Sequence, residues 1–330
     1  MTQSEFSLID QFFKVRGVLR DDVVLAIGDD AAVTTIPAGY QLVTAVDTLV
    51  NGVHFPLDSQ PFDVGHKALA VNLSDLAAMG AEPAWATLAL TLTEADDNWL
   101  QQFCDGFFQL AKVFNVQLIG GDTTQGPLSV TVQIMGLVPQ GKAITRSGAQ
   151  PGDQVFVSGT LGDAALGLRI HQQTLPANRL SEQQATFLCD RLHRPLPRIA
   201  LGIALRDIAS SMIDISDGLA ADLTHILEAS KVGATIAMEQ LPVSDSVQTL
   251  RESVDIETSV LRGATRYQVK QYRCNRGARW LACAKQRQGN DLSPARFRAL
   301  YRGLSRQSYP PDCYGYSREI CESNLYLIDK

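Results

Sequence analysis

Aspartates recur in this sequence close to the ends of apolar stretches, and such a pattern could hold metal ions. Carboxylate oxygens are the ligands that hard cations prefer, although one acid after a glycine more often marks a solvated turn. Several acids gathered in one place would repel one another unless cations bridged them to a polyphosphate. The sequence therefore predicts one shared basin of carboxylates that binds Mg²⁺. Its candidate members are Asp29, Asp30, Asp47, Asp75, Asp122, Asp214 and Asp217.

The most informative of these places is the stretch 116–127. An apolar run reaches Gly120 and Gly121, and Asp122 follows with two threonines. Glycine admits close approach of the backbone to another group, so we expect a strand end where phosphate oxygens and a metal meet. Phosphoryl transfer needs mainly positioning and charge neutralisation, and Arg146 is the candidate phosphate contact. The sequence contains neither a Gly-x-x-x-x-Gly-Lys-Ser/Thr loop nor a kinase-type His-Arg-Asp loop.

Helices and strands alternate along the chain, which predicts an α/β (α+β) fold in two domains. The first domain would span 1–150, and the second, a C-terminal α/β domain, would span 151–330. Asp75 lies on the clearest helix, where an Ala/Leu-rich surround would leave an unpaired charge costly. The expected helices are 5–16, 61–79, 96–114, 199–209 and 220–229, and the expected strands are 42–46, 84–93, 116–119, 128–138, 154–158 and 211–215.

The character of the chain changes near residue 259. Residues 1–258 hold 15 Lys and Arg against 30 Asp and Glu, a net charge of −15, whereas residues 259–330 hold 14 against 5, a net of +9. The latter segment also carries four of the six cysteines and seven of the eight tyrosines. Its stretch 302–311 is typical of unstructured sequence. Any interpretation has to account for this tail.

Composition narrows the class of protein. The 45% hydrophobic content suits a globular protein with a sizeable core. The sequence opens without a charged-then-apolar leader and has no run of about 20 apolar residues, so the expected compartment is the cytoplasm. The cysteines lack zinc-like spacing and imply no disulfides.

Seven segments together resemble the bacterial thiamine-monophosphate kinases, a family within the aminoimidazole-ribonucleotide-synthetase-like superfamily. The resemblance covers residues 1–258 in order. The segments are Glu5–Ile9, Gly28–Ala31, Asp47–Val50 with His54–Phe55, Lys67–Ala81, Gly120–Thr124, Thr145–Ala149 and Asp214–Leu219.

The resemblance implies a fold, a partner and a reaction. The N-terminal sheet would form a barrel across a homodimer, with a C-terminal α/β domain beside it. The activity would be ATP-dependent phosphorylation of thiamine monophosphate to thiamine diphosphate by direct in-line transfer, assisted by Mg²⁺. Nucleic acid and membranes are not expected partners.

The resemblance also implies roles for particular residues. Asp122 and Arg146 would be catalytic, and His54 would contact the substrate, although a lone histidine after a turn is usually structural. The implied contacts to ATP are Gly121, Asp122, Arg146 and Ser216. The implied metal ligands are Asp30, Asp47, Asp75, Asp122, Asp214 and Asp217.

Two departures from the family pattern bear on these roles. Ala45 and Val46 precede Asp47 where the family often has Ser-Thr, so a ligand role there falls to backbone carbonyls. The family's Gly-Gly-Glu-Asp-Tyr-Glu segment, which helps to hold the substrate, is missing after Thr258. We interpret residues from about Ser259 onward as the product of a reading-frame shift, which would leave the C-terminal domain incomplete, with an unpaired sheet edge. A genuine basic tail is the alternative, and translation of the other two frames past codon 258 distinguishes them.

Three other functions remain open from the sequence. The chain could be a nucleotide-binding homologue with impaired catalysis, because the substrate segment is missing. It could be another ATP-using member of the superfamily. A nucleic-acid-binding protein that uses the basic tail is the third, and a steep salt dependence of DNA affinity would favour it. Turnover of thiamine monophosphate with Mg-ATP would favour the kinase.

Overall fold

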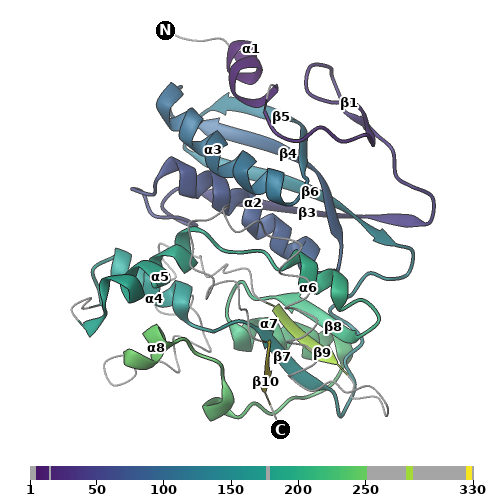
Figure 1. Ribbon diagram of the computed structural model, residues 1–330, viewed down its shortest axis with the longest axis vertical. Helices are drawn as coiled ribbons and strands as arrows, with labels where there is room; N and C mark the ends of the chain where they lie inside the picture. Colours follow the sequence, from purple (N-terminus) through teal and green to yellow (C-terminus); the bar gives the residue numbers. More distant parts are fainter. Residues whose placement is uncertain (1–4, 15, 176–178, 251–279, 285–324, 329–330) are drawn as a thin grey trace.

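The computed structural model describes residues 5–14, 16–175, 179–250, 280–284 and 325–328. Two four-stranded sheets, one in each half of the chain, are stacked along the long axis, with helices on and between them (Figure 1). The predicted α/β class is confirmed. No helix within the described ranges is both long enough and apolar enough to span a bilayer.

The first sheet has the strand order β3-β6-β4-β5. Antiparallel pairing joins β3 (Tyr40–Val50) to β6 (Ser129–Pro139) and β6 to β4 (Glu82–Leu92), while β5 (Gln117–Gln125) runs parallel to β4. The expected strands 42–46 and 116–119 were too short. Asp47 and Asp122 lie inside β3 and β5 rather than at strand ends, because β6 and β4 pair along the whole length of their neighbours.

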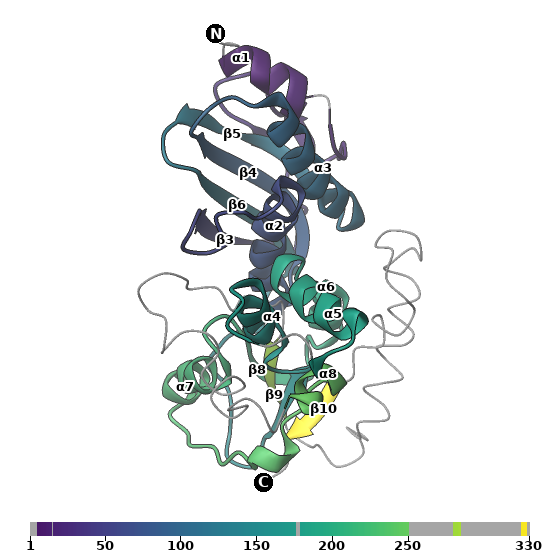
Figure 2. The same cartoon turned by 90° about the vertical axis from the view of Figure 1, so that its left-hand side faces the viewer.

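Helices α2 (Pro61–Ala78) and α3 (Asp97–Val113) cover one face of this sheet (Figure 2). Pro61 stands in the first turn of α2, and Asp96 caps α3 by accepting the N–H groups of Asn98 and Trp99 at 2.9 and 3.2 Å. Core leucines and phenylalanines on both helices are almost fully buried. The opposite face of the sheet is largely bare, and Val46 of β3 is 61% exposed there.

An N-terminal arm lies against β4 and β5. It contains α1 (Glu5–Leu8), a π-helical segment (Ile9–Lys14), and the paired strands β1 (Val23–Leu25) and β2 (Val33–Thr34). The expected single helix over 5–16 is therefore wrong in its second part, which is a π-helix.

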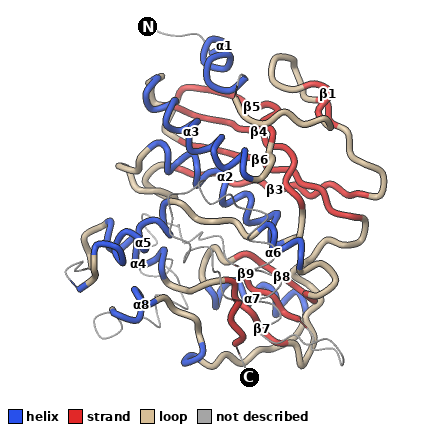
Figure 3. Tube along the Cα trace, in the orientation of Figure 1, coloured by secondary structure: helices blue, strands red, loops and turns tan. Residues whose placement is uncertain are grey.

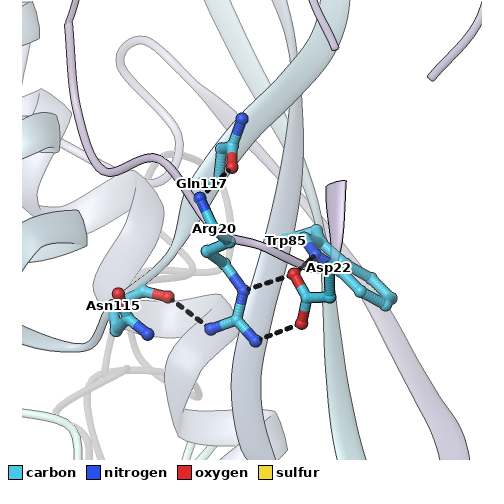
Figure 4. Close-up of polar contacts among 5 residues, drawn as sticks. All are labelled: Arg20, Asp22, Trp85, Asn115 and Gln117. Atoms are coloured by element: carbon cyan, nitrogen blue, oxygen red, sulfur yellow. Dashed lines mark hydrogen bonds and ion pairs between the residues drawn. The ribbon is translucent and has the colours of Figure 1, made fainter. Parts of the chain in front are cut away.

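A hydrogen-bonded cluster around Arg20 fixes this arm to the sheet (Figure 4). The guanidinium donates to both oxygens of Asp22, at 2.9 and 2.6 Å, and to the carbonyl of Asn115 at 2.9 Å. The indole N–H of Trp85, on β4, donates to Asp22 Oδ1 at 3.0 Å, and the Arg20 N–H donates to Gln117 Oε1 at 2.7 Å. The cluster thereby sets where the following Gly28–Asp30 loop lies.

The second sheet has the strand order β10-β7-β9-β8, and each pair of neighbouring strands is antiparallel. Figure 3 shows β7, β8 and β9 below the first sheet. Its strands are β7 (Gln154–Ser158), β8 (Ala209–Asp214), β9 (Trp280–Ala284) and β10 (Leu325–Ile328). Two strands of the tail belong to this sheet, since β9 lies between β7 and β8 and β10 pairs with the other side of β7. The stretch 302–311 lies outside the described residues.

The α-helices described beside the second sheet are α4 (Asp163–His171), α5 (Glu182–His193), α6 (Ile199–Ala204), α7 (Leu219–Ser230) and α8 (Asp245–Thr249). Helix α6 is shorter than the expected 199–209, because Leu205–Ile208 form turns and β8 already begins at Ala209.

Helix α2 also links the two halves of the molecule, lying between the first sheet and the helices α5 and α6 (Figure 2). Arg206 donates to the carbonyl of Gly80 at 2.6 Å, just beyond the C-terminus of α2. At the other end, Arg194 pairs with Asp63 at 2.5 Å and its guanidinium lies 5.0 Å from the centroid of the Phe62 ring. These contacts hold the second half against α2, which carries Asp75.

Candidate functional site

A cavity of about 630 Å³ lies along the free edge of β5. The 27–32 loop, the π-helical segment and β5 residues 118–123 enclose it, and it contains Asp29, Asp30 and Asp122 together with Lys14. Both Asp30 and Asp122 are exposed to solvent. The carboxylates beside this glycine-containing strand could supply one or two ligands to a metal whose other ligands are phosphate oxygens and water.

The reason for Gly121 is the packing of β5 on β4. Its φ is +155°, and a Cβ there would stand 1.9 Å from the carbonyl oxygen of Leu88. At Gly121 the backbone of β5 therefore comes into close approach with the neighbouring strand, β4. Gly120 is different, since only a Thr87 methyl lies near its missing Cβ, at 4.0 Å. Because Gly120 has no side chain, the backbone of β5 is open to the cavity at this residue.

A second group of charges lies where the two halves meet. Asp75 comes from α2, Asp214 is the last residue of β8, and Arg146 belongs to the segment that joins the two sheets. Burial raises the pKa of Asp75, and the Arg146 charge opposes that rise. Burial, then the charges of Asp75 and Asp222, raise the pKa of Asp214. These carboxyls are close enough to repel one another, with one arginine as their shared cation.

The segment that carries Arg146 is held along β8 by backbone contacts. Met212 donates its N–H to the carbonyl of Thr145 at 3.0 Å. The Ser230 hydroxyl accepts the N–H groups of Gly148 and Ala149, at 3.2 and 3.1 Å, and donates to the carbonyl of Arg146 at 3.3 Å. These hydrogen bonds hold the segment 145–149 in place, so the exposed Arg146 side chain starts from a defined backbone position.

The single basin expected from the sequence is not present in one copy of the chain. Asp47 shares a row of the sheet with Val132 and Leu88, whereas Asp122 pairs with Ala89 in the adjacent row. Adjacent rows point to opposite faces of a sheet. Across the described part of the chain, no group of three His, Cys, Asp or Glu side chains could hold a metal ion. The acids lie in two groups instead.

His54 lies in the loop after β3, and a backbone N–H group at the end of β3 holds the imidazole ring in place. The N–H of Val50 donates to His54 Nδ1 at 2.9 Å. In a neutral ring the hydrogen then sits on Nε2. The imidazole can therefore offer an N–H donor, which is what a substrate contact through an oxygen would require.

Sequence reasoning missed one residue of the second group, Asp222. Its carboxylate is 2% exposed and lies under the loop that carries Ser216 and Asp217. Burial raises its pKa to about 6, although the N–H groups of the loop lower it. The sequence signal that could have identified Asp222 is its position in the first turn of a helix, four residues after Gly218.

The start of α4, which follows the turn over 159–162, carries a further buried acid. Asp163 is fully buried and accepts the hydroxyls of Thr160 and Ser244, at 2.6 and 2.7 Å. The turn is therefore structural.

Comparisons with known proteins agree with this arrangement. Residues 28–138 match the family described as AIR synthase related protein, N-terminal domain, and residues 150–269 match its C-terminal domain. The thiamine-monophosphate kinase of Escherichia coli K12 is 51% identical over 269 residues, which are 82% of each chain.

Solved structures of similar proteins give the same family. The thiamine-monophosphate kinase of Stenotrophomonas maltophilia superposes with a TM-score of 0.74 at 42% identity, covering 94% of this chain and 90% of that one. A structure of AaThiL complexed with AMPPCP and TMP gives a TM-score of 0.69 at 27% identity, covering 92% and 84%.

Proposed function

Because this chain belongs to the thiamine-monophosphate kinases within the AIR synthase related family, we propose that it transfers the γ-phosphoryl group of ATP to thiamine monophosphate. The observation that supports this most directly is the place of the family's acidic segments. One group of acids lines the solvent-accessible cavity beside β5, and the other lies between the two halves of the molecule, close to Arg146. The ATP requirement favours a cytoplasmic location.

The donor set suits Mg²⁺. Hard carboxylate oxygens are present in both groups, and Mg²⁺ usually takes one or two carboxylates together with phosphate oxygens and water. Burial and mutual repulsion already disfavour the ionised forms of Asp75 and Asp214, so a nearby dication would relieve that cost. When bound, Mg²⁺ would neutralise charge on the polyphosphate. The ligands of the Mg²⁺ ions would be divided among Asp30, Asp47, Asp75, Asp122, Asp214 and Asp217, one or two carboxylates to each ion.

The protein's own groups would position the reactants. Arg146 offers a forked donor to phosphate oxygens from a fixed backbone. Gly121 and Ser216 would approach the nucleotide, and the His54 ring would contact the substrate through its Nε2 hydrogen. Direct in-line transfer asks for alignment of the two phosphates and little covalent chemistry from the protein.

We further propose that the bare face of the first sheet is the dimer contact. The exposed apolar side chains of β3 there are Tyr40, Leu42 and Val46, at 40%, 44% and 61% exposure. Burying such a face against its own copy would give a symmetric interface and a closed sheet. The barrel implied by the resemblance is one way to do so.

The test of the reaction is turnover of thiamine monophosphate with ATP and Mg²⁺ by the purified chain, followed as thiamine diphosphate formed. Asp122→Asn should lower kcat by at least about 100-fold, the scale seen when one electrostatic group is removed from a transition state. The exposed Glu94→Gln is the matched control and should keep full activity.

Two results would count against this assignment. Unchanged turnover by Asp122→Asn would remove Asp122 from the mechanism. A wild-type chain that is folded and binds Mg-ATP, yet forms no thiamine diphosphate, would contradict the proposed activity and favour a catalytically impaired homologue.

A further inference from the structure

The loop between β8 and α7 is wrapped around one buried oxygen atom. Asp222 Oδ2 accepts three consecutive backbone N–H groups, from Ser216 at 2.9 Å, Asp217 at 3.1 Å and Gly218 at 3.1 Å. The side chain of Asp222 is almost completely shielded from solvent. Hydrogen bonds to an ionised acceptor are about twice as strong as neutral ones, so this carboxylate determines the path of the loop.

We propose that Asp222 is a positioning residue, which holds the 216–218 loop so that Ser216 and Asp217 present their side chains to Mg-ATP. It touches neither the nucleotide nor the metal and acts through the backbone of the loop. The inference rests on the proposed function, because the ATP and metal roles of Ser216 and Asp217 come from there.

The physical basis is the chemistry of consecutive backbone donors. Three successive free N–H groups in a turn form a concavity that binds anions such as phosphate. Asp222 supplies that anion from within the protein, so the donors of the loop point inward. The side chain of Asp217 is exposed and that of Ser216 partly so. The loop therefore offers side-chain oxygens, rather than backbone donors, to whatever approaches it.

Conformation and charge both support this role. Gly218 has a φ of +117°, a region that favours glycine, and it lets the chain turn sharply around the carboxylate. The charge of Asp222 also acts on Asp214, the first acid of the same corner. If position 222 were needed only for packing, an apolar side chain would serve there. A third carboxylate whose charge acts on Asp214, as that of Asp75 does, adds a repulsion that is costly when buried.

Two substitutions separate geometry from charge. Asp222→Asn removes the charge but can keep one oxygen as acceptor for all three N–H groups. Asp222→Glu keeps the charge but displaces the oxygens by one methylene. Leu223→Ala is the matched control, because Leu223 is its buried neighbour on α7 and contacts the core rather than the loop.

The readouts are calorimetric affinity for Mg-ATP, amide hydrogen exchange of the peptide covering 216–218, and kcat and KM with thiamine monophosphate. Asp222→Glu should speed exchange in the loop and weaken Mg-ATP binding by about 10-fold, the lower end of losses from disturbed supports of metal ligands. Asp222→Asn should retain slow exchange and stay within about threefold of wild-type affinity. Leu223→Ala should lower Tm without changing Mg-ATP affinity.

The proposal is overturned if Asp222→Glu folds, exchanges faster in the loop and still binds Mg-ATP as tightly as wild type. It is equally overturned if Asp222→Asn keeps slow exchange but loses affinity 10-fold, since charge would then be the cause. Should Asp222→Glu fail to fold, Asp222→Ala takes its place, because it removes the acceptor oxygens and is judged by the same loop exchange and Mg-ATP affinity. A wild-type chain that binds Mg-ATP without turnover contradicts the proposed activity only, and the affinities still test Asp222.

Discussion

At the scale of single residues, buried and half-buried carboxylates in this protein shape the backbone around them. Asp163 at the start of α4 accepts two hydroxyls, Asp222 in the first turn of α7 accepts three amides, and Asp22 in the N-terminal arm accepts a guanidinium and an indole. Each arrangement fixes a loop that leads into or out of a sheet. Acid residues here therefore divide into those that hold loops and those available to ligands.

Asp22 gives a prediction about pH. The hydrogen bonds from Arg20, ahead of that from Trp85, hold the pKa of Asp22 below its ordinary value of 3.8. Its stabilisation is thus complete above about pH 4 and is lost as the pH falls through the lower, folded-state pKa. Asp22→Asn should lower the free energy of unfolding by about 1–3 kcal/mol at pH 7, the range for hydrogen bonds to charged groups.

Urea unfolding of both proteins at several pH values checks this prediction. The difference between wild type and Asp22→Asn should narrow as the pH drops below 4. Asp21→Asn, the exposed neighbour, should match wild type throughout. A gap that stays constant into strong acid would show that the ionised carboxylate is not the source of the stability.

At the scale of elements, the pair α2 and α3 depends on two glycines. A Cβ on Gly106 of α3 would lie 2.0 Å from the carbonyl oxygen of Phe62, and one on Gly65 of α2 would lie 2.0 Å from that of Phe103. The helices touch through their backbones at both points. This close crossing sets the position of α2 on the sheet, and therefore of Asp75 near its C-terminal end.

Gly106→Ala should therefore destabilise the fold by at least about 1–3 kcal/mol, the usual cost of overpacking, because the obstacle is backbone and cannot rotate away. The measurement is the urea midpoint with an unchanged m-value. Gly233→Ala is the control, since no heavy atom lies within 4 Å of its built Cβ. Equal midpoints for the two variants would contradict the close crossing.

At the scale of the whole molecule, the two halves form one unit through α2 (Figure 2), yet among the described residues one face of the first sheet is covered only where the N-terminal arm packs on Trp85 and Ile119. An exposed apolar patch of this kind usually marks an interaction site. The proposed occupant is a second copy of the chain.

Val46→Asp should convert the proposed dimer to a monomer, because a charge at the centre of an apolar interface would be buried without a partner. Sedimentation velocity of wild type and variant measures this directly. Leu19→Asp, at a residue 88% exposed in the N-terminal arm, serves as control and should leave the dimer intact. A monomeric wild type, or a dimeric Val46→Asp, would exclude this face as the contact.

The tail belongs to the same scale. The frame-shift interpretation implied an unpaired sheet edge; among the described residues β9 and β10 pair with the two sides of β7, while β8 pairs through β9 alone. Strand pairing needs only backbone groups, which is why unusual side-chain composition did not exclude it. The frame-shift interpretation stays a prediction, and a Gly-Gly-Glu-Asp-like segment in another frame would support it.

Features that depend on neighbours along the chain could be predicted from the amino-acid sequence. Helix periodicity and caps place α2 and α3 to within a residue or two, since both signals are local. The seven family segments likewise needed no structure. Only the tertiary structure decided that Asp47 and Asp122 lie within strands on adjacent rows, that Gly121 serves strand contact, and that Asp222 holds the 216–218 loop. Each of these depends on pairing or burial between segments far apart in sequence, which local pattern does not specify.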